Sequence, residues 1–317
     1  MIDEALLHYN LVNYKAELIR HNENITYKVT DDNGQYVLRI HKPVDGFNLD
    51  LLRMGNDPVK QIKDEMQLLK QLNMHSKLGT QNVVENIHSD SVTVLKDGTP
   101  VTVLKWIDGC TLENVDITED ICMKMGVMIA KMHKSLQGLH LENRYQYNEK
   151  LLLKMLDETD TAFDKGHLSK TQAETIKSTL TYIYAYFSKV KSRYVLVHSD
   201  LGKSNLIYQN GKIIPIDFSL SGISIPEMDL ASAFCHINNE NLNNCILNGY
   251  TSEMGYAVDK NGIDTCICLQ ILLFVLSQHD KVSGQPWFPG KVDEWCRDRF
   301  IPLITGEEAA KNIGLYI

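Results

Sequence analysis

The stretch VHSDLGKSN, residues 197–205, places several reactive side chains directly after the apolar run 194–196. Asp200 and Asn205 lie five positions apart, and Asp217 follows after a further twelve. Carboxylate and amide oxygens are the ligands that hard cations such as Mg²⁺ take, together with phosphate groups. A simple turn would use some of these residues, whereas a site that handles phosphate would use nearly all of them.

The segment LIYQNGKIIPIDF predicts how Asp217 comes close to Asn205. The Asn-Gly pair at 210–211 is the favoured two-residue turn of a β-hairpin. Counting outwards from this turn places Asn205 opposite Ile216, with Asp217 one residue beyond. Pro215 cannot donate to the ladder, which weakens the register but not the proximity. We therefore expect Asn205 and Asp217 to be neighbours at the open end of one hairpin.

The order H-x-D-x-x-x-x-N and then D-F is the arrangement that phosphoryl transfer uses in protein kinases. In this pattern Asp200 accepts the proton of the substrate hydroxyl, and Asn205 and Asp217 hold the metal. Lys203 lies three residues after Asp200, where a cation meets a transferring phosphate, and a solvated loop charge is the alternative. For His198 we expect a structural role within the loop.

Arg39 and Glu65 are the candidates for a second charged pair. Phosphoryl transfer needs a cation on a strand, steadied by a carboxylate on a helix. Arg39 lies in the β-rich run YVLRI, and Glu65 falls between Ile62 and Leu69 on the apolar face of a helix predicted to begin at 57–58. An unpaired carboxylate on that face would be costly, so the two side chains are predicted to pair. An ordinary exposed strand residue is the alternative for Arg39.

The pattern along the chain predicts a two-lobed α+β protein. Residues 1 to about 20 read as a helix, and the β-rich runs 25–29 and 35–41 flank the turn DDNG. Further strands are expected at 83–87, 91–95 and 101–106, and helices at 118–137, 147–164, 168–190, 241–253, 262–279 and 291–304. A β-rich N-lobe, 1–105, is therefore expected before a mainly helical C-lobe, 106–317.

Composition limits the classes of partner. The chain has 317 residues, with 40 acidic and 32 basic side chains and a net charge of −8, which argues against a nucleic-acid surface. The longest apolar stretch, 266–276, is too short to span a bilayer, so no membrane contact is expected. Seven cysteines without a CxxC pair fit buried, reduced thiols, and the acidic N-terminal segment does not resemble a signal peptide. These features favour a cytoplasmic protein and indicate no particular oligomeric state.

The motifs together resemble the aminoglycoside phosphotransferase and choline kinase-like family of small-molecule kinases. The resemblance covers nearly the whole chain, and VHSDLGKSNLIY and IPIDFSLSG are its most specific segments. The supporting segments are GQYVLRIHKP, VTVLKWIDG, GVMIAKMHKSL and IPEMDLASAF. The resemblance implies a protein-kinase-like fold, ATP or GTP and Mg²⁺ as cofactors, and phosphate transfer to a small-molecule hydroxyl. The acceptors of this family include aminoglycosides, amino alcohols, homoserine and sugar-like compounds.

The resemblance also implies nucleotide contacts. It assigns these contacts to Asn24, Thr26, Tyr27, Arg39, Glu65, Lys105 and Ile107. Arg39, paired with Glu65, would contact the ATP phosphates, and the segment that begins at Asn24 would cover them. The backbone of Lys105 and Ile107 would meet the adenine ring between the lobes.

Several departures refine this interpretation. The chain has no GxGxxG loop, only twelve residues separate Asp217 from Asp229, and the DFG position reads DFS at 217–219. These features favour a small-molecule acceptor over a protein. The run 202–204, Gly-Lys-Ser, replaces the His-Pro-Gly-like run common in the family, and Arg39 replaces a lysine.

Asp229 is expected to cap the helix DLASAF or to brace the catalytic loop. A nucleotide-binding pseudokinase with a regulatory or scaffold role is the alternative function.

Overall fold

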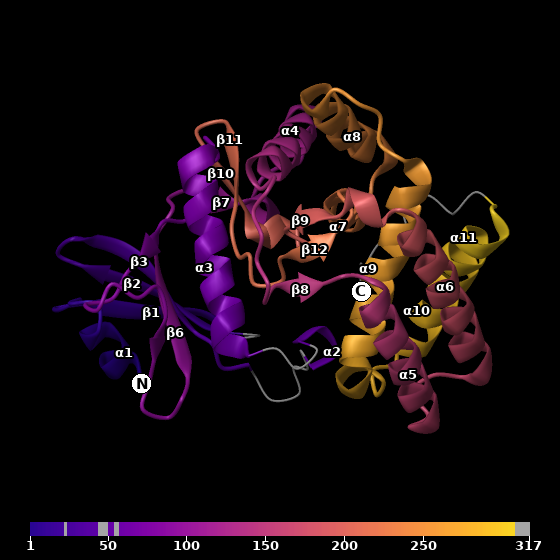
Figure 1. Ribbon diagram of the computed structural model, residues 1–317, viewed down its shortest axis with the longest axis horizontal. Helices are drawn as coiled ribbons and strands as arrows, with labels where there is room; N and C mark the ends of the chain where they lie inside the picture. Colours follow the sequence, from indigo (N-terminus) through magenta and orange to yellow (C-terminus); the bar gives the residue numbers. More distant parts are fainter. Residues whose placement is uncertain (22–23, 44–49, 54–56, 308–317) are drawn as a thin grey trace.

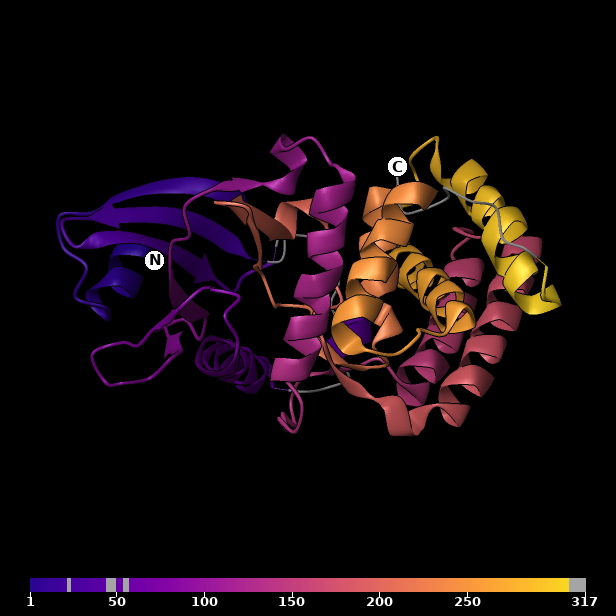
Figure 2. The same cartoon turned by 90° about the horizontal axis from the view of Figure 1, so that it is seen from above.

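The protein has a sheet at one end and a group of helices at the other, as the computed structural model shows in two views (Figure 1, Figure 2). The structure describes residues 1–21, 24–43, 50–53 and 57–307. Helix α3 (Pro58–His75) lies alongside the sheet, on its C-lobe side (Figure 1). The predicted α+β class and kinase-like, two-lobed architecture are confirmed. The boundary placed after residue 105 stays a prediction, and strand β6 ends at Lys105.

The N-lobe sheet is antiparallel, in the order β1-β2-β3-β6-β4, with β5 also paired to β6. Its strands are β1 (Lys15–His21), β2 (Ile25–Asp31), β3 (Gly34–Ile40), β4 (Val83–Val84), β5 (Thr93–Val94) and β6 (Pro100–Lys105). The predicted hairpin forms, and the Asp31 carboxylate closes its turn by accepting the backbone N–H of Asn33 at 2.8 Å.

The helix predicted over residues 1–20 is wrong beyond its first turns. Helix α1 covers only Ile2–Leu7, and strand β1 begins at Lys15. Asn10 and Asn13 adopt left-handed backbone angles, with φ of 52° and 53°, and this conformation cannot continue a right-handed helix. Strand β1 lies at the sheet edge and buries none of its side chains fully, so its sequence carries no clear alternation.

Helix α3 begins as the sequence predicts. The Asp57 carboxylate accepts the N–H of Val59 at 2.9 Å, and proline follows at the first helical position. The apolar side chains of Ile62, Met66 and Leu69 lie on one face and are buried in the larger hydrophobic core. Glu65 shares this face and is only 2% exposed, so its charge needs a partner inside the protein.

The remaining chain is mainly helical. Its helices are α2 (Asp50–Arg53), α4 (Glu119–Ser135), α5 (Glu149–Asp164), α6 (Lys170–Lys189), α7 (Glu227–Ile237), α8 (Glu240–Met254), α9 (Lys260–Val282), α10 (Phe288–Trp295) and α11 (Ile301–Thr305). Short 3₁₀ turns lie at Leu112–Asn114, Lys191–Arg193 and Lys203–Asn205. The helix expected at 291–304 is divided, because a π-helical turn at Cys296–Phe300 separates α10 from α11.

Helices α4 and α8 pack closely because glycine faces backbone at both sides of their contact. A Cβ on Gly126 of α4 would lie 1.9 Å from the Ile246 carbonyl oxygen. A Cβ on Gly249 of α8 would lie 2.1 Å from the Met123 carbonyl oxygen. Neither position can therefore accept a side chain without separating the helices.

Two three-stranded sheets shape the centre of the C-lobe. They contain β7 (Cys110–Thr111), β8 (Tyr145–Gln146), β9 (Val195–Val197), β10 (Leu206–Gln209), β11 (Lys212–Pro215) and β12 (Gly222–Ser224), in the orders β11-β10-β7 and β8-β12-β9. The predicted hairpin forms in the predicted register, with Gln209 opposite Lys212 and the Ile216 N–H donating to the Asn205 carbonyl at 2.9 Å. Asn210 and Gly211 both have positive φ, as its tight turn requires.

Helix α9 lies within the C-lobe (Figure 1) and has the length and apolarity of a membrane-crossing helix. It is the one such helix in the described ranges, and 72% of its apolar window is buried inside the protein. The burial is that of a core helix. Its cysteines, Cys266 and Cys268, are among the five of the seven thiols that are buried. This confirms the expectation of mainly buried thiols.

Candidate active site

The loop between β9 and β10 carries Asp200 and is called the catalytic loop after its predicted role. It is held by one buried carboxylate. Asp229 accepts the backbone N–H groups of His198 and Ser199 at 3.0 and 2.6 Å. Ser199 has a φ of 69°, and this left-handed turn aims both N–H groups at the carboxylate. Helix α7 has no side-chain cap, so of the two roles considered for Asp229 the structure shows bracing.

The bracing extends to helices α4 and α8. Asp229 also bonds the Nε2 atom of His133 at 2.9 Å, and the Nδ1 atom of His133 lies 2.9 Å from the Tyr250 hydroxyl. His133 and Asp229 are 3% and 0% exposed. A continuous chain of hydrogen bonds therefore joins α8, through α4, to the catalytic loop.

His198 connects the catalytic loop to the segment that carries Asp217. Its ring is fully buried, and its Nε2 atom lies 3.0 Å from the Ile216 carbonyl oxygen. The ring also packs at 4.4 Å from the ring of Phe218. These contacts give His198 the structural place that was expected for it.

Asp200 and Asn205 lie together at the loop end. The Asn205 amide donates to the Asp200 carboxylate at 2.8 Å and to the Asp200 carbonyl at 3.0 Å. Both bonds use the amide nitrogen, and the Oδ1 atom of Asn205 is buried without a hydrogen-bond partner. A buried acceptor without a donor is costly in a protein, and a bound cation would satisfy it.

Asp217 is an ionised carboxylate between the lobes. It pairs with Arg39 at 3.3 Å and with Arg20 of strand β1. Burial alone would raise the pKa of Asp217, but the nearby Arg39 and Arg20 guanidinium groups outweigh it and lower the pKa to about 2. The backbone at Asp217 has a φ of 62°, which turns this residue out of the strand direction. The Oδ1 atom of Asp217, like that of Asn205, is buried without a hydrogen bond.

The predicted pairing of Arg39 with Glu65 is present. The guanidinium Nη1 atom lies 2.6 Å from the Glu65 Oε1 atom, and the two side chains are 4% and 2% exposed. The alternative of an exposed strand residue at Arg39 is therefore wrong. Arg39 reaches both Glu65 of α3 and Asp217, so it links strand, helix and catalytic segment.

A cavity of about 490 Å³ opens between the lobes beside these groups. Of the predicted nucleotide residues, Thr26, Arg39 and Ile107 line it, and Asp217 lies at its edge with them. Its apolar lining includes Val37 of β3 and Trp106 of the interlobe crossing, among others. A cavity whose lining combines apolar side chains with charged ones suits a nucleotide.

The structure places the other predicted residues away from this lining. Asn24 borders a smaller neighbouring cavity that also contains Glu65. Tyr27 packs with the N-lobe core beneath the sheet. The Lys105 ammonium lies 4.1 Å from the centre of the Tyr36 ring. The backbone N–H of Lys105 donates to the Asn82 carbonyl at 2.8 Å. Lys203, three residues after Asp200, is half-buried, and its neighbour Ser204 lines the cavity. The roles of these residues stay predictions.

Two arginines with a place at the site were not predicted from the sequence. Arg20 lines the cavity and pairs with Asp217, but it lies in the segment that was expected to be helical. Arg144 is 2% exposed and donates to the backbone carbonyls of Gln61, Phe218, Ser219 and Ser221, at 2.6–2.9 Å. No local motif marks either residue, because their partners lie 74 to 197 positions away in the sequence.

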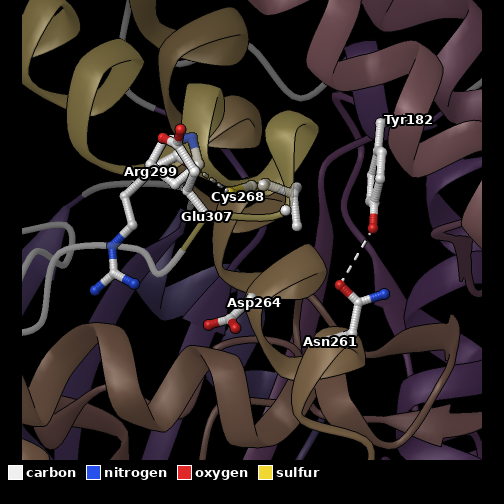
Figure 3. A pocket seen from close by; sticks show the side chains of 9 residues that line it. Tyr182, Asn261, Asp264, Cys268, Arg299 and Glu307 are labelled. Carbon is white, nitrogen blue, oxygen red and sulfur yellow. Dashed lines mark hydrogen bonds between the residues drawn. The ribbon is translucent and has the colours of Figure 1, made fainter.

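A third cavity, of about 200 Å³, lies among α6, α9 and α11 (Figure 3). Tyr182 and Asn261 share a hydrogen bond of 3.2 Å at one side, and Asp264 and Arg299 lie at the other. Burial raises the pKa of the Asp264 carboxyl. This cavity shares no lining residue with the interlobe cavity and contains none of the predicted site residues.

The chain matches known proteins by family model and by structure. A model described as the phosphotransferase enzyme family matches residues 15–255. A microcompartment-associated aminopropanol kinase has a TM-score of 0.72 at 18% identity, covering 93% of each chain. An amicoumacin kinase complex has a TM-score of 0.75 at 16% identity, covering 100% of this chain and 94% of the other. Choline kinase from Cryptosporidium parvum Iowa II has a TM-score of 0.61 at 14% identity, covering 96% and 94%. No curated protein sequence matches.

Proposed function

Because the chain belongs to the phosphotransferase enzyme family, we propose that it transfers the γ-phosphate of ATP or GTP to a small-molecule hydroxyl. Mg²⁺ is the proposed metal, and the acceptor classes are aminoglycosides, amino alcohols, homoserine and sugar-like compounds. The observation that carries the proposal is that the hairpin brings the residue before Asp217 against Asn205, which bonds Asp200, while Asp217 lines the interlobe cavity. The structurally similar kinases of aminopropanol, amicoumacin and choline support a small acceptor.

The proposed metal ligands are Asn205 and Asp217. The Asn205 Oδ1 atom is buried without a hydrogen-bond donor, and the Asp217 Oδ1 atom is held by the Arg39 ion pair at 3.3 Å rather than by a hydrogen bond. Both oxygens suit a hard cation. When bound, Mg²⁺ would neutralise charge on the nucleotide phosphates. Arg39 is proposed to bind the same phosphates, since its guanidinium is fixed by Glu65 and cannot lose its charge.

Asp200 is proposed to orient the acceptor hydroxyl and to take its proton. The Asn205 amide and the braced loop fix the direction of the Asp200 carboxylate before any acceptor binds. Such positioning, with charge neutralisation, is the main source of rate in phosphoryl transfer. Lys203 is proposed as a contact to the transferring phosphate.

The nucleotide base is proposed to lie against the apolar lining of the cavity, which includes Val37 and Trp106. There the backbone of Lys105 and Ile107 would meet adenine, and Asn24, Thr26 and Tyr27 would belong to the segment over the phosphates. Thr26 supports this arrangement most directly, because it lines the cavity and lies opposite Arg39 in the sheet register.

The test is nucleotide consumption with a panel of hydroxylated metabolites and aminoglycosides. We expect turnover with at least one acceptor class, and we expect it to require a divalent metal. Asp200→Asn should lower kcat by about 10²-fold or more, because general-base catalysis contributes about that much. Asp164→Asn, at the exposed end of α5, is the matched control and should keep full activity.

Three outcomes would contradict the proposal or one of its parts. An active preparation whose turnover is unchanged by Asp200→Asn would remove the catalytic role of this residue. Nucleotide binding without turnover on any acceptor would instead favour the pseudokinase alternative. Turnover that survives removal of divalent metal would count against Asn205 and Asp217 as metal ligands.

A further inference from the structure

A cluster of His167, His279 and Asp280 lies outside the interlobe cavity. His167 belongs to the connection between α5 and α6, whereas the other two residues lie in the last turns of α9. The two Nδ1 atoms are 2.8 Å apart, and each lies 3.5 Å from the Asp280 Oδ1 atom. Three ligand atoms of the kind that metals bind therefore face one another across two elements.

The dimensions of this cluster suit a transition-metal ion. Above a triangle with sides of 2.8, 3.5 and 3.5 Å there is a point at about 2 Å from each corner, the usual Zn–N and Zn–O distance. Without a cation, the two facing Nδ1 atoms can share only one proton, which one nitrogen donates and the other accepts. A cation between them would let both nitrogens act as electron-pair donors.

Glu158 of α5 adds the outer partner that metal-binding histidines usually have. Its Oε1 atom lies 2.7 Å from the Nε2 atom of His279, whose side chain is only 2% exposed. This carboxylate holds the proton on Nε2 and leaves Nδ1 with a free electron pair toward His167. Carboxylate–histidine–metal arrangements of this kind fix the ring and increase its basicity.

We propose that His167, His279 and Asp280 bind one divalent transition-metal ion of the zinc class, with water as the fourth ligand. Two imidazoles and one carboxylate favour such an ion over the Mg²⁺ expected at the oxygen cluster of the cleft. The Asp280 side chain is 58% exposed, so the ion has a path from solvent. Lys165, which lies 2.9 Å from both Asp280 oxygens, would move away when the ion binds.

The first test measures zinc binding to the complete protein after dialysis against a chelator. Excess Mg²⁺ is present throughout, so that the oxygen ligands of the cleft are occupied. We expect one Zn²⁺ per chain by titration calorimetry and a higher Tm in its presence, since the ion binds only the folded state. No zinc binding by the unmodified protein would overturn the proposal.

The second test locates the ion. His167→Ala should weaken zinc binding by more than about tenfold, and Glu158→Gln by about 10–100-fold, as loss of an outer partner does. His140→Ala, at an exposed histidine, and Asp217→Asn should leave zinc affinity unchanged. Zinc binding that is unaffected by His167→Ala, or that disappears with Asp217→Asn, would overturn the assignment. Circular dichroism and the metal-free Tm confirm that each variant is folded.

Discussion

Asp217 is the residue on which the charges of the site meet. Its carboxylate lies between Arg39 and Arg20, and both guanidinium groups stabilise its ionised form. The pairing keeps a buried carboxylate charged before any cation arrives. Two measurable consequences follow, one for stability against pH and one for metal affinity.

The first consequence is a loss of stability in acid. The pKa of Asp217 falls from its ordinary 3.8 to about 2 in the folded protein, so its contribution is present above pH 3.8 and is lost as the pH falls toward 2. We expect metal-free wild-type protein to lose about 2 kcal/mol more unfolding free energy than Asp217→Asn between about pH 5 and about pH 2. Urea unfolding at each pH measures this difference. Parallel pH curves for the two proteins would contradict it.

The second consequence concerns Arg20. A metal ion at Asp217 would replace this arginine, so Arg20→Gln should bind Mn²⁺ more tightly, by about two- to fivefold for a pair that is partly exposed. Titration of Mn²⁺ by electron paramagnetic resonance measures the affinity. Arg297→Gln removes an equally paired but exposed arginine and should not change it. Weaker binding in Arg20→Gln would show that Arg20 supports the ion.

Single residues could be predicted where the pattern of one helix or strand was enough to mark them. Glu65 was identified because its position on an apolar helix face demands a partner, and Arg39 was the available strand cation. Arg20 was missed because its role depends on β1, an edge strand without a readable alternation. Asp229 was identified, but only the tertiary structure distinguishes bracing the loop from capping a helix.

At the scale of elements, the contact between α4 and α8 depends on glycine. Gly126→Ala would place a methyl group against the Ile246 carbonyl and should lower the unfolding free energy by about 1–3 kcal/mol or more. In α10, a Cβ added at Gly290 would meet no atom of another element within 4 Å. Gly290→Ala should therefore be neutral or stabilising by up to about 1 kcal/mol. Urea unfolding of both variants tests the pair. Equal effects would contradict the role assigned to Gly126.

Elements with strong local signals were predictable, and elements defined by distant partners were not. The Asp57 cap fixed the start of α3, and the Asn-Gly turn at 210–211 fixed the register of β10 and β11. Strands β8 and β12 were not expected, since each is two or three residues long and pairs in parallel across a large sequence separation. The π-helical turn at Cys296–Phe300 likewise has no signal in the hydrophobic pattern.

At the scale of the whole molecule, Arg144 joins the lobes. It donates to the Gln61 carbonyl of α3 and to three carbonyls of the segment just after Asp217. Asp64 of α3 adds a second link by accepting the Asn143 N–H at 2.7 Å. Helix α3 and the segment that follows Asp217 are therefore anchored to the same short stretch of chain.

We expect Arg144→Met to destabilise the protein by about 3 kcal/mol or more, because four carbonyls, three of them in buried hydrogen bonds, lose a charged donor. The same change should weaken Mn²⁺ binding, since the segment beside Asp217 loses its support. Arg297→Met, at an exposed site, serves as the control for both measurements. An Arg144→Met protein of normal stability would contradict the structural role of this residue.

The hydrogen-bond chain from Tyr250 through His133 to Asp229 has an evolutionary consequence. Helix α8 carries none of the predicted site residues, and yet its Tyr250 supports the loop that carries Asp200. Substitution at Tyr250 is thus limited by the needs of a loop in another part of the chain. The fold divides this helix into a face fixed by its buried residues Ile246, Gly249 and Tyr250 and a face that packing leaves open to change.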